Sequence, residues 1–159
     1  MSDDNPSQTR PMANMLAAAR EGQLSVAMKA EDFIYIDRDC NYFKDAIRRI
    51  QVVMNEVSRH EQWGLGETTE GMVSANTLVS RFKKKANLAD DRNSVSEILD
   101  DHYRIVEDIQ ETYKIVRDRM MQSDSDFAAD FNRLNTTLPE RPPVQLPYGP
   151  VALPDGTGK

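Results

Sequence analysis

The chain has 159 residues, of which 39% are hydrophobic and 29% are charged, and a formal net charge of -6, so we expect one soluble domain with tails. No stretch approaches the ~20 apolar residues that span a bilayer, the acidic and polar first ten residues are unlike a signal peptide, and no strongly basic segment favours nucleic acid or an anionic membrane. The single cysteine, Cys40, excludes an internal disulfide and a cysteine-based zinc site.

The N-terminal part of the chain predicts one short helix. Residues 1–10 are polar and are expected to be disordered. Pro11 can open a helix over residues 12–20, because the first turn of a helix does not need the N–H that proline lacks. Gly22 is suited to end this helix.

The next stretch is ambiguous until a long helix begins. Residues 24–28 alternate apolar and polar, and residues 33–36 read Phe-Ile-Tyr-Ile. Both are too short for periodicity to assign, so they are either extended segments or a loop packed on a bundle. A helix of about 24 residues is predicted after Asp37, a good N-cap. Its apolar stripe consists of Phe43, Ala46, Ile47, Ile50, Val53, Met54 and Val57.

Two glycines in Trp63-Gly64-Leu65-Gly66 end this helix and predict a reversal of the chain. A second apolar stripe occupies the returning arm between Met72 and Ala86, and the polar residues 87–93 interrupt it. Ser94 and Glu97 then form an S-x-x-E capping box, which predicts a fresh helix start or a kink near residue 94.

The clearest periodicity follows this capping box. Seven residues spaced three and four apart form a near-heptad stripe, namely Val95, Ile98, His102, Ile105, Ile109, Thr112 and Val116. The helix is predicted to end near Gln122, at a length of roughly 45 Å. A short amphipathic helix through Phe127 and Phe131 should follow, with Ser123 or Ser125 as its cap.

These elements predict an all-α fold, an antiparallel helical hairpin or bundle with a long C-terminal helix. The predicted organisation is a disordered N-terminus over 1–10, a helical bundle over 11–134 and a disordered Pro-rich tail over 135–159. Six of the eight prolines lie in this tail, where they prevent helix and sheet. The apolar stripes of the long helices need cover, either from each other in a monomer or from another chain.

No catalytic, cofactor or metal site is predicted. The two histidines, His60 and His102, lack the Glu three residues earlier that helical di-iron sites use. Cys40 has no histidine near it in the sequence to activate a thiolate. We therefore expect a non-enzymatic protein that acts by binding another protein, with no nucleic acid and no membrane insertion.

Three short segments form a further pattern. Ile34–Asp39 leads into the first long helix with an acidic cap, Trp63-Gly64-Leu65-Gly66 forms the turn, and Tyr103-Arg104-Ile105-Val106-Glu107 lies on the returning arm. Over residues 20–122 this pattern resembles the Trp-X-Gly family of small helical-hairpin proteins handled by actinobacterial type VII secretion. That family has a Trp-X-Gly turn and a Tyr-x-x-x-Asp/Glu secretion signal. Leu65 stands where the family has glycine.

The resemblance implies an antiparallel four-helix bundle, formed as a homo- or heterodimer with a similar hairpin. It implies that Trp63, Gly64 and Gly66 of the turn and the Tyr103/Glu107 pair are the secretion motif and partner-binding residues, which a secretion ATPase recognises. The function would be that of a type VII secretion-like substrate or partner protein, cytoplasmic or secreted without a cleavable signal peptide. The alternative is a cytosolic helical adaptor or structural protein with no secretion role.

Overall fold

The structure, a computed structural model, describes residues 10–89 and 92–140, and all regular structure within these ranges is helical. The elements in chain order are α1 (Ala13–Glu21), α2 (Ala30–Arg59), α3 (Val73–Lys83), the π-helix η1 (Lys84–Leu88), α4 (Val95–Ser123) and α5 (Ser125–Thr137). The prediction of an all-α fold is confirmed for these residues. Most of the two predicted tails, 1–9 and 141–159, lies outside the described residues.

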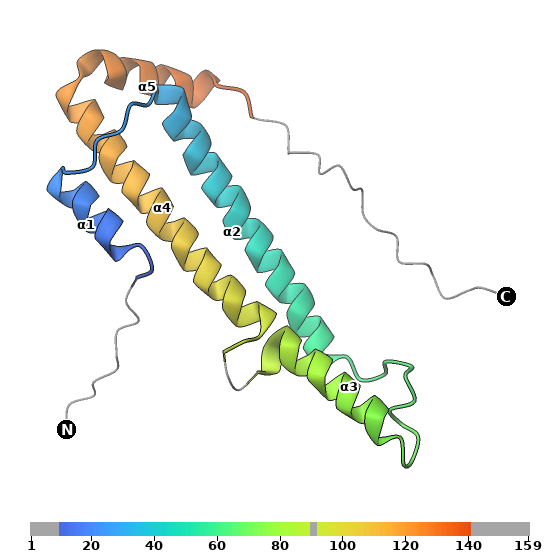
Figure 1. Ribbon diagram of the computed structural model, residues 1–159. Coiled ribbons are helices and arrows are strands. Elements are labelled where there is room, and N and C mark those ends of the chain that lie inside the picture. The colour runs from blue at the N-terminus through green and yellow to red at the C-terminus, as the bar shows by residue number, and fades with distance from the viewer. Residues whose placement is uncertain (1–9, 90–91, 141–159) are drawn as a thin grey trace, which may run out of the picture.

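Two long antiparallel helices, α2 and α4, run side by side and form the body of the molecule (Figure 1). α4 continues the line of α3 and η1 as a separate helix, so the returning arm of the hairpin consists of more than one helix (Figure 1). α5 crosses the end where α2 begins, and α1 lies beside α4 on the side away from α2. The predicted hairpin is therefore present.

The apolar core lies at the end of the hairpin that α5 crosses. Its buried members come from four helices: Ala19, Ala30, Phe33, Ile34, Val116 and Phe131. Phe33 makes edge-to-face contacts with Tyr113 and Phe127, at centroid distances of 6.2 and 5.8 Å. Each such pair adds about 0.5–1.5 kcal/mol to the gain from burial alone, so this end is anchored by apolar packing.

α2 begins at Ala30, earlier than the start predicted after Asp37. The carboxylate of Asp32 accepts the backbone N–H of Lys29 at 2.9 Å, which satisfies a donor at the first turn. The acidic first turn also complements the positive end of the helix dipole. The predicted start was wrong because this earlier cap precedes Asp37.

The segment that joins α1 to α2 divides into two parts. Residues 24–28 form a loop packed on the bundle, with Leu24, Val26 and Met28 partly buried against the core. This is the second of the two predicted alternatives. Residues 33–36 are helical, so both alternatives were wrong there. Their aromatic and β-branched side chains favour strands in isolation, but burial against α5 and α4 decides the outcome.

Capping explains where α4 and α5 start. The predicted capping box is confirmed, because the Oγ of Ser94 accepts the N–H of Glu97 at 3.3 Å. The predicted cap of α5, Ser123 or Ser125, was wrong. Asp124 takes that position and accepts the N–H groups of the second and third residues after it, at 2.9 and 3.0 Å. Its carboxylate is better matched than a hydroxyl to the positive end of the helix.

Residues just outside both ends of the predicted helical domain take part in the described structure. Arg10, expected in the disordered N-terminus, forms an ion pair with Asp108. α5 continues past residue 134 to Thr137. There the hydroxyls of Thr136 and Thr137 donate to the carbonyl of Arg133, at 3.0 and 2.9 Å, so the last turn keeps its polar groups satisfied.

Candidate functional site

Trp63 closes the corner between α2 and α3. Its ring stacks on Phe82, with centroids 5.7 Å apart and an interplanar angle of 13°, and it meets His60 edge-to-face at 5.6 Å. The indole Nε1 donates to the carbonyl of His60 at 3.0 Å. Trp63 therefore joins the end of α2 to α3, and its ring is half-buried in doing so.

Glu67 fixes the backbone of this corner. Its carboxylate accepts the N–H groups of three consecutive residues, Trp63, Gly64 at 3.2 Å and Leu65 at 2.8 Å. Hydrogen bonds from its own backbone N–H and from these groups lower the pKa of Glu67. Sequence reasoning missed Glu67, although an acidic residue just after a glycine-rich turn is a signal for such a cap.

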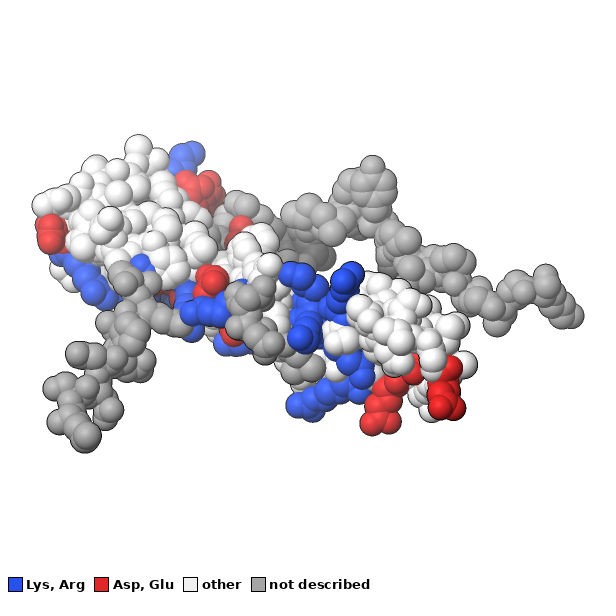
Figure 2. Space-filling view, turned by 60° about the horizontal axis from the view of Figure 1, so that its bottom comes forward, with Lys and Arg blue, Asp and Glu red and all other residues white. Residues whose placement is uncertain are grey.

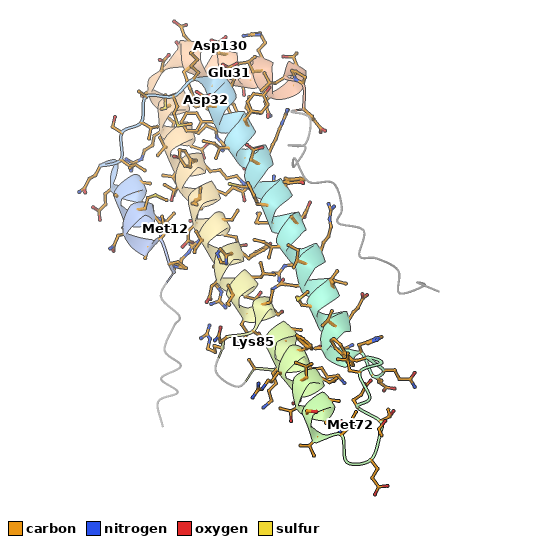
Figure 3. All side chains as sticks on the ribbon, turned by 45° about the vertical axis from the view of Figure 1, so that its right-hand side comes forward. Met12, Glu31, Asp32, Met72, Lys85 and Asp130 are labelled. Atoms are coloured by element: carbon orange, nitrogen blue, oxygen red, sulfur yellow. The ribbon has the colours of Figure 1, made fainter. Side chains whose placement is uncertain are left out.

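The two predicted glycines have the backbone that the corner requires. Gly64 and Gly66 have φ values of 70° and 88°, in the left-handed region that favours glycine. A Cβ on Gly66 would also lie 3.4 Å from the Cε of Met72. Met72 lies at the opposite end of the molecule from Glu31, Asp32 and Asp130, beyond the end of α2 (Figure 3).

The structure separates the second predicted motif from the corner. Tyr103 faces α2, where the guanidinium carbon of Arg48 lies 4.1 Å from its ring centroid, whereas Glu107 is exposed. Arg48 and His60, which contacts Trp63, are separated by about 18 Å of α2. The five predicted residues therefore occupy two places, and Tyr103 packs within the hairpin.

Polar side chains fill much of the contact between α2 and α4. Gln110 is 5% exposed and accepts from the Nζ of Lys44 at 2.7 Å. Its amide donates to the side-chain oxygens of Asp37 and Asn41, at 2.8 and 2.9 Å. Nearer the corner, Gln51 donates to a carboxylate and to a backbone carbonyl of α4. These contacts set the register of the two helices.

Part of each predicted apolar stripe of α2 and α4 is consequently uncovered, although Ile47 and Val116 are buried. On α2, Phe43 and Ile50 are 57% and 45% exposed, and on α4, Val95 and Ile98 are 38% and 41% exposed. At about 100° per residue these positions turn away from the α2–α4 contact. Both helices are right-handed, and in each the stripe is offset from the α2–α4 contact by a similar angle. Because the two helices are antiparallel, these offsets place both stripes on the same side of the hairpin.

We call this side the open face. It combines the four exposed residues with half-buried apolar neighbours, so that its members are Phe43, Ile50, Met54, Val57, Val95, Ile98, Ile105 and Ile109. His102 also lies on this stripe and is exposed, with Nδ1 2.8 Å from the carbonyl of Ile98. The open face is therefore apolar with one titratable ring, and its flanks carry the charged side chains.

Basic side chains gather near the corner end of the molecule (Figure 2). The chain supplies five around η1, namely Arg81, Lys83, Lys84, Lys85 and Arg92. Lys85 donates to the carbonyl of Asn93 at 3.2 Å, and Arg92 lies 3.7 Å from Asp101. These contacts match a solvated charged surface.

The described residues carry little reactive chemistry. Across 10–89 and 92–140, no three or more His, Cys, Asp or Glu side chains are grouped to hold a metal ion. Burial and the nearby carboxylate of Asp37 raise the pKa of the Cys40 thiol, which opposes a reactive thiolate. No described helix combines the length and the apolar character needed to cross a membrane.

The chain matches no protein-family model, no curated protein and no solved structure.

Proposed function

We propose that this chain is a non-enzymatic protein that binds another helical chain through its open face. The observation that carries this proposal is the apolar face that its own helices leave uncovered. The face runs about 21 Å along α2 from Phe43 to Val57 and is two helices, about 20 Å, wide. An exposed apolar patch of this size, roughly 400 Å², is typical of an interaction site.

A second hairpin of the same kind fits this face. Two such faces pressed together form a four-helix bundle with both pairs of stripes inside. Charge favours a second copy of this chain, because residues 43–59 of α2 carry four basic and two acidic side chains, whereas residues 95–111 of α4 carry one basic and six acidic. A twofold axis parallel to the helices would place α2 of each copy over α4 of the other.

This arrangement has a register that can be tested. Within one chain, Gln51 of α2 hydrogen-bonds Asp100 of α4 at 2.8 Å, so Ile50 lies between the heights of Ile98 and His102. All three residues belong to the stripes that form the open face. In the twofold dimer, Ile50 of one copy would therefore lie beside Ile98 of the other.

The mass of the purified chain in solution tests self-association. Light scattering across a concentration series should give twice 18.1 kDa, and Ile50→Glu should return the protein to one chain because it places a charge inside the apolar face. Val73→Glu is the matched control, since Val73 is 73% exposed on α3, away from the open face. A single chain at every concentration would exclude a second copy, and a dimer unaffected by Ile50→Glu would exclude the open face.

A charge pair then tests the register. Combining Ile50→Glu with Ile98→Lys should restore part of the affinity that Ile50→Glu removes, because the two introduced charges meet across the interface. Independent, additive losses in the double variant would reject the twofold arrangement while leaving the open face intact.

The resemblance to the Trp-X-Gly family supports a more specific role, that of a type VII secretion-like substrate or partner protein. The hairpin with Trp63 at its corner and the exposed Glu107 on the returning arm support this proposal. In an actinobacterial host, Glu107→Ala should remove the chain from the culture filtrate without lowering its amount in cells. Glu61→Ala, exposed near the corner, is the control. A chain that stays inside cells would favour the cytosolic adaptor instead.

A further inference from the structure

α1 is attached to α4 through a short apolar contact and several ion pairs. Among the helices of the described chain, α4 is the one that α1 contacts, and α1 lies along it (Figure 1). Leu16 and Ala19 are the buried residues of α1. α5, in contrast, contacts both α2 and α4, so the ion pairs are a larger part of the attachment of α1 than of α5.

A buried carboxylate receives the start of α1. Asp108 is 1% exposed, and its two oxygens accept the Nε–H of Arg10 at 2.5 Å and the backbone N–H of Met12, the residue before α1, at 3.1 Å. Glu111, one turn further, pairs with Arg10 at 2.7 Å and with Arg20 at 2.6 Å. The two arginines thus hold both ends of α1 to one carboxylate of α4.

The end of α1 is fixed by a cation. The guanidinium of Arg119 donates to the carbonyl of Arg20, and Gly22 has a φ of 77° at a point where a Cβ would collide with that guanidinium. α4 therefore presents an acid to the positive end of α1 and a base to its negative end, which matches the helix dipole at both termini.

The surface beneath α1 is itself polar. Asp108 and Glu111 can take water in place of their arginine partners, and Thr112, which is fully buried, donates its hydroxyl to the carbonyl of Asp108 at 2.7 Å. Opening this contact would expose Leu16 and Ala19 of α1 and leave the contacts among α2, α4 and α5 in place. A segment that packs on one neighbouring element opens at lower free energy than an element held on several sides.

We propose that α1 is a releasable strap, which leaves α4 as a unit while α2, α4 and α5 stay packed, and that its charge pairs set how often it opens. The opened state uncovers a cradle on α4 with Asp108 at one end and Arg119 at the other. This cradle fits one short helix that runs parallel to α4. It lies on a different side of α4 from the open face, so the strap does not depend on the proposed dimer.

Hydrogen exchange of the full chain tests the strap. On raising the salt from ~0.05 M to ~1 M, which shortens the Debye length to about 3 Å, amides of residues 16–21 should lose protection by about tenfold, the combined effect of several ion pairs. Amides in the α5-covered part of α4 should keep theirs. If salt leaves the protection of α1 unchanged, or loosens α1 and α4 equally, the strap is excluded.

A variant separates the charge pairs from general salt effects. Arg10→Ala combined with Arg20→Ala should produce the same loss in α1 at low salt, by about tenfold. Arg133→Ala, which removes an ion pair within α5, is the matched control and should leave α1 unchanged. Circular dichroism of the double variant must show the remaining helices folded. Undiminished protection of α1 in that folded variant would overturn the proposal.

Discussion

The two ends of the hairpin are held together in different ways. At the α5 end, large side chains such as Phe33 and Phe131 are 3% and 8% exposed and pack between four helices. At the corner end, Leu78 and Phe82 are 42% and 46% exposed, and the backbone is fixed by the carboxylate of Glu67. The α5 end therefore has the larger apolar core, whereas the corner end buries smaller apolar side chains, Ala75, Val79 and Ala86.

The largest expected loss of stability comes from a substitution at the apolar end. Phe33→Ala should lower the free energy of unfolding by about 3–5 kcal/mol, because it removes a buried ring and leaves a cavity among aromatic neighbours. Tyr42→Ala is the matched control on the same helix, at 57% exposure and outside the open face, and should change the free energy of unfolding by less than ~0.5 kcal/mol. Urea titration measures both. Equal losses would mean that the two regions are not held differently.

A smaller effect is expected where the two long helices meet through polar groups. Gln110→Ala should destabilise the chain by about 1–3 kcal/mol, because Lys44, Asp37 and Asn41 lose a shared partner in a half-buried contact. Gln122→Ala, near the exposed end of α4, serves as the control in the same urea titration. A stabilised Gln110→Ala variant would show that the polar contact is there for register alone.

Local signals explain what the sequence could predict. The capping box at Ser94 and the glycines after Trp63 act within a few residues, so the start of α4 and the reversal are visible without tertiary structure. The early start of α2 could not be predicted from the sequence, because the helical state of Phe33 depends on burial against α5. The placement of α1 depends on Arg10 meeting Asp108, a long-range pair that periodicity does not reveal.

In the candidate site, too, local signals could be read from the sequence and long-range contacts could not. The apolar stripes could be located from their spacing, but their exposure could not, since Gln110 and Lys44 turn the helices so that polar residues meet. Tyr103 likewise reads as one half of an exposed motif, whereas the hairpin register places it against Arg48. A stripe in a sequence identifies a face, and the rotation of the helix about its axis decides what covers it.

At the corner end, the backbone is the sensitive element. Gly64→Ala should destabilise the chain by about 1 kcal/mol, because its φ of 70° lies in the left-handed region that alanine disfavours. The neighbouring Leu65→Ala is the control, as Leu65 is 44% exposed and loses little packing. Thermal melting compares the two. If Leu65→Ala proved the more damaging, the side chain and not the backbone would hold the corner.

The smallest expected effect is a loss of stability at low pH. The folded pKa of Glu67 is lowered by backbone N–H groups and that of Glu111 by hydrogen bonds from Arg10 and Arg20, so each carboxylate contributes stability above its unfolded pKa of about 4.3. That contribution is lost as the pH falls through the lowered folded pKa, because the unfolded chain then binds more protons.

Glu67→Gln should therefore flatten the fall in stability between pH ~5 and ~3, while Glu70→Gln, on the same loop, should not. Glu67 binds the backbone of the corner, whereas Glu111 binds the arginines of α1. Glu67→Gln and Glu111→Gln should therefore change the pH dependence of stability in different parts of the molecule. Exchange rates resolved by segment should show Glu67→Gln acting on residues near Trp63 and Glu111→Gln acting on α1. If each variant altered both regions, the corner and the strap would be coupled through α4, and the division of the hairpin into independent parts would fail.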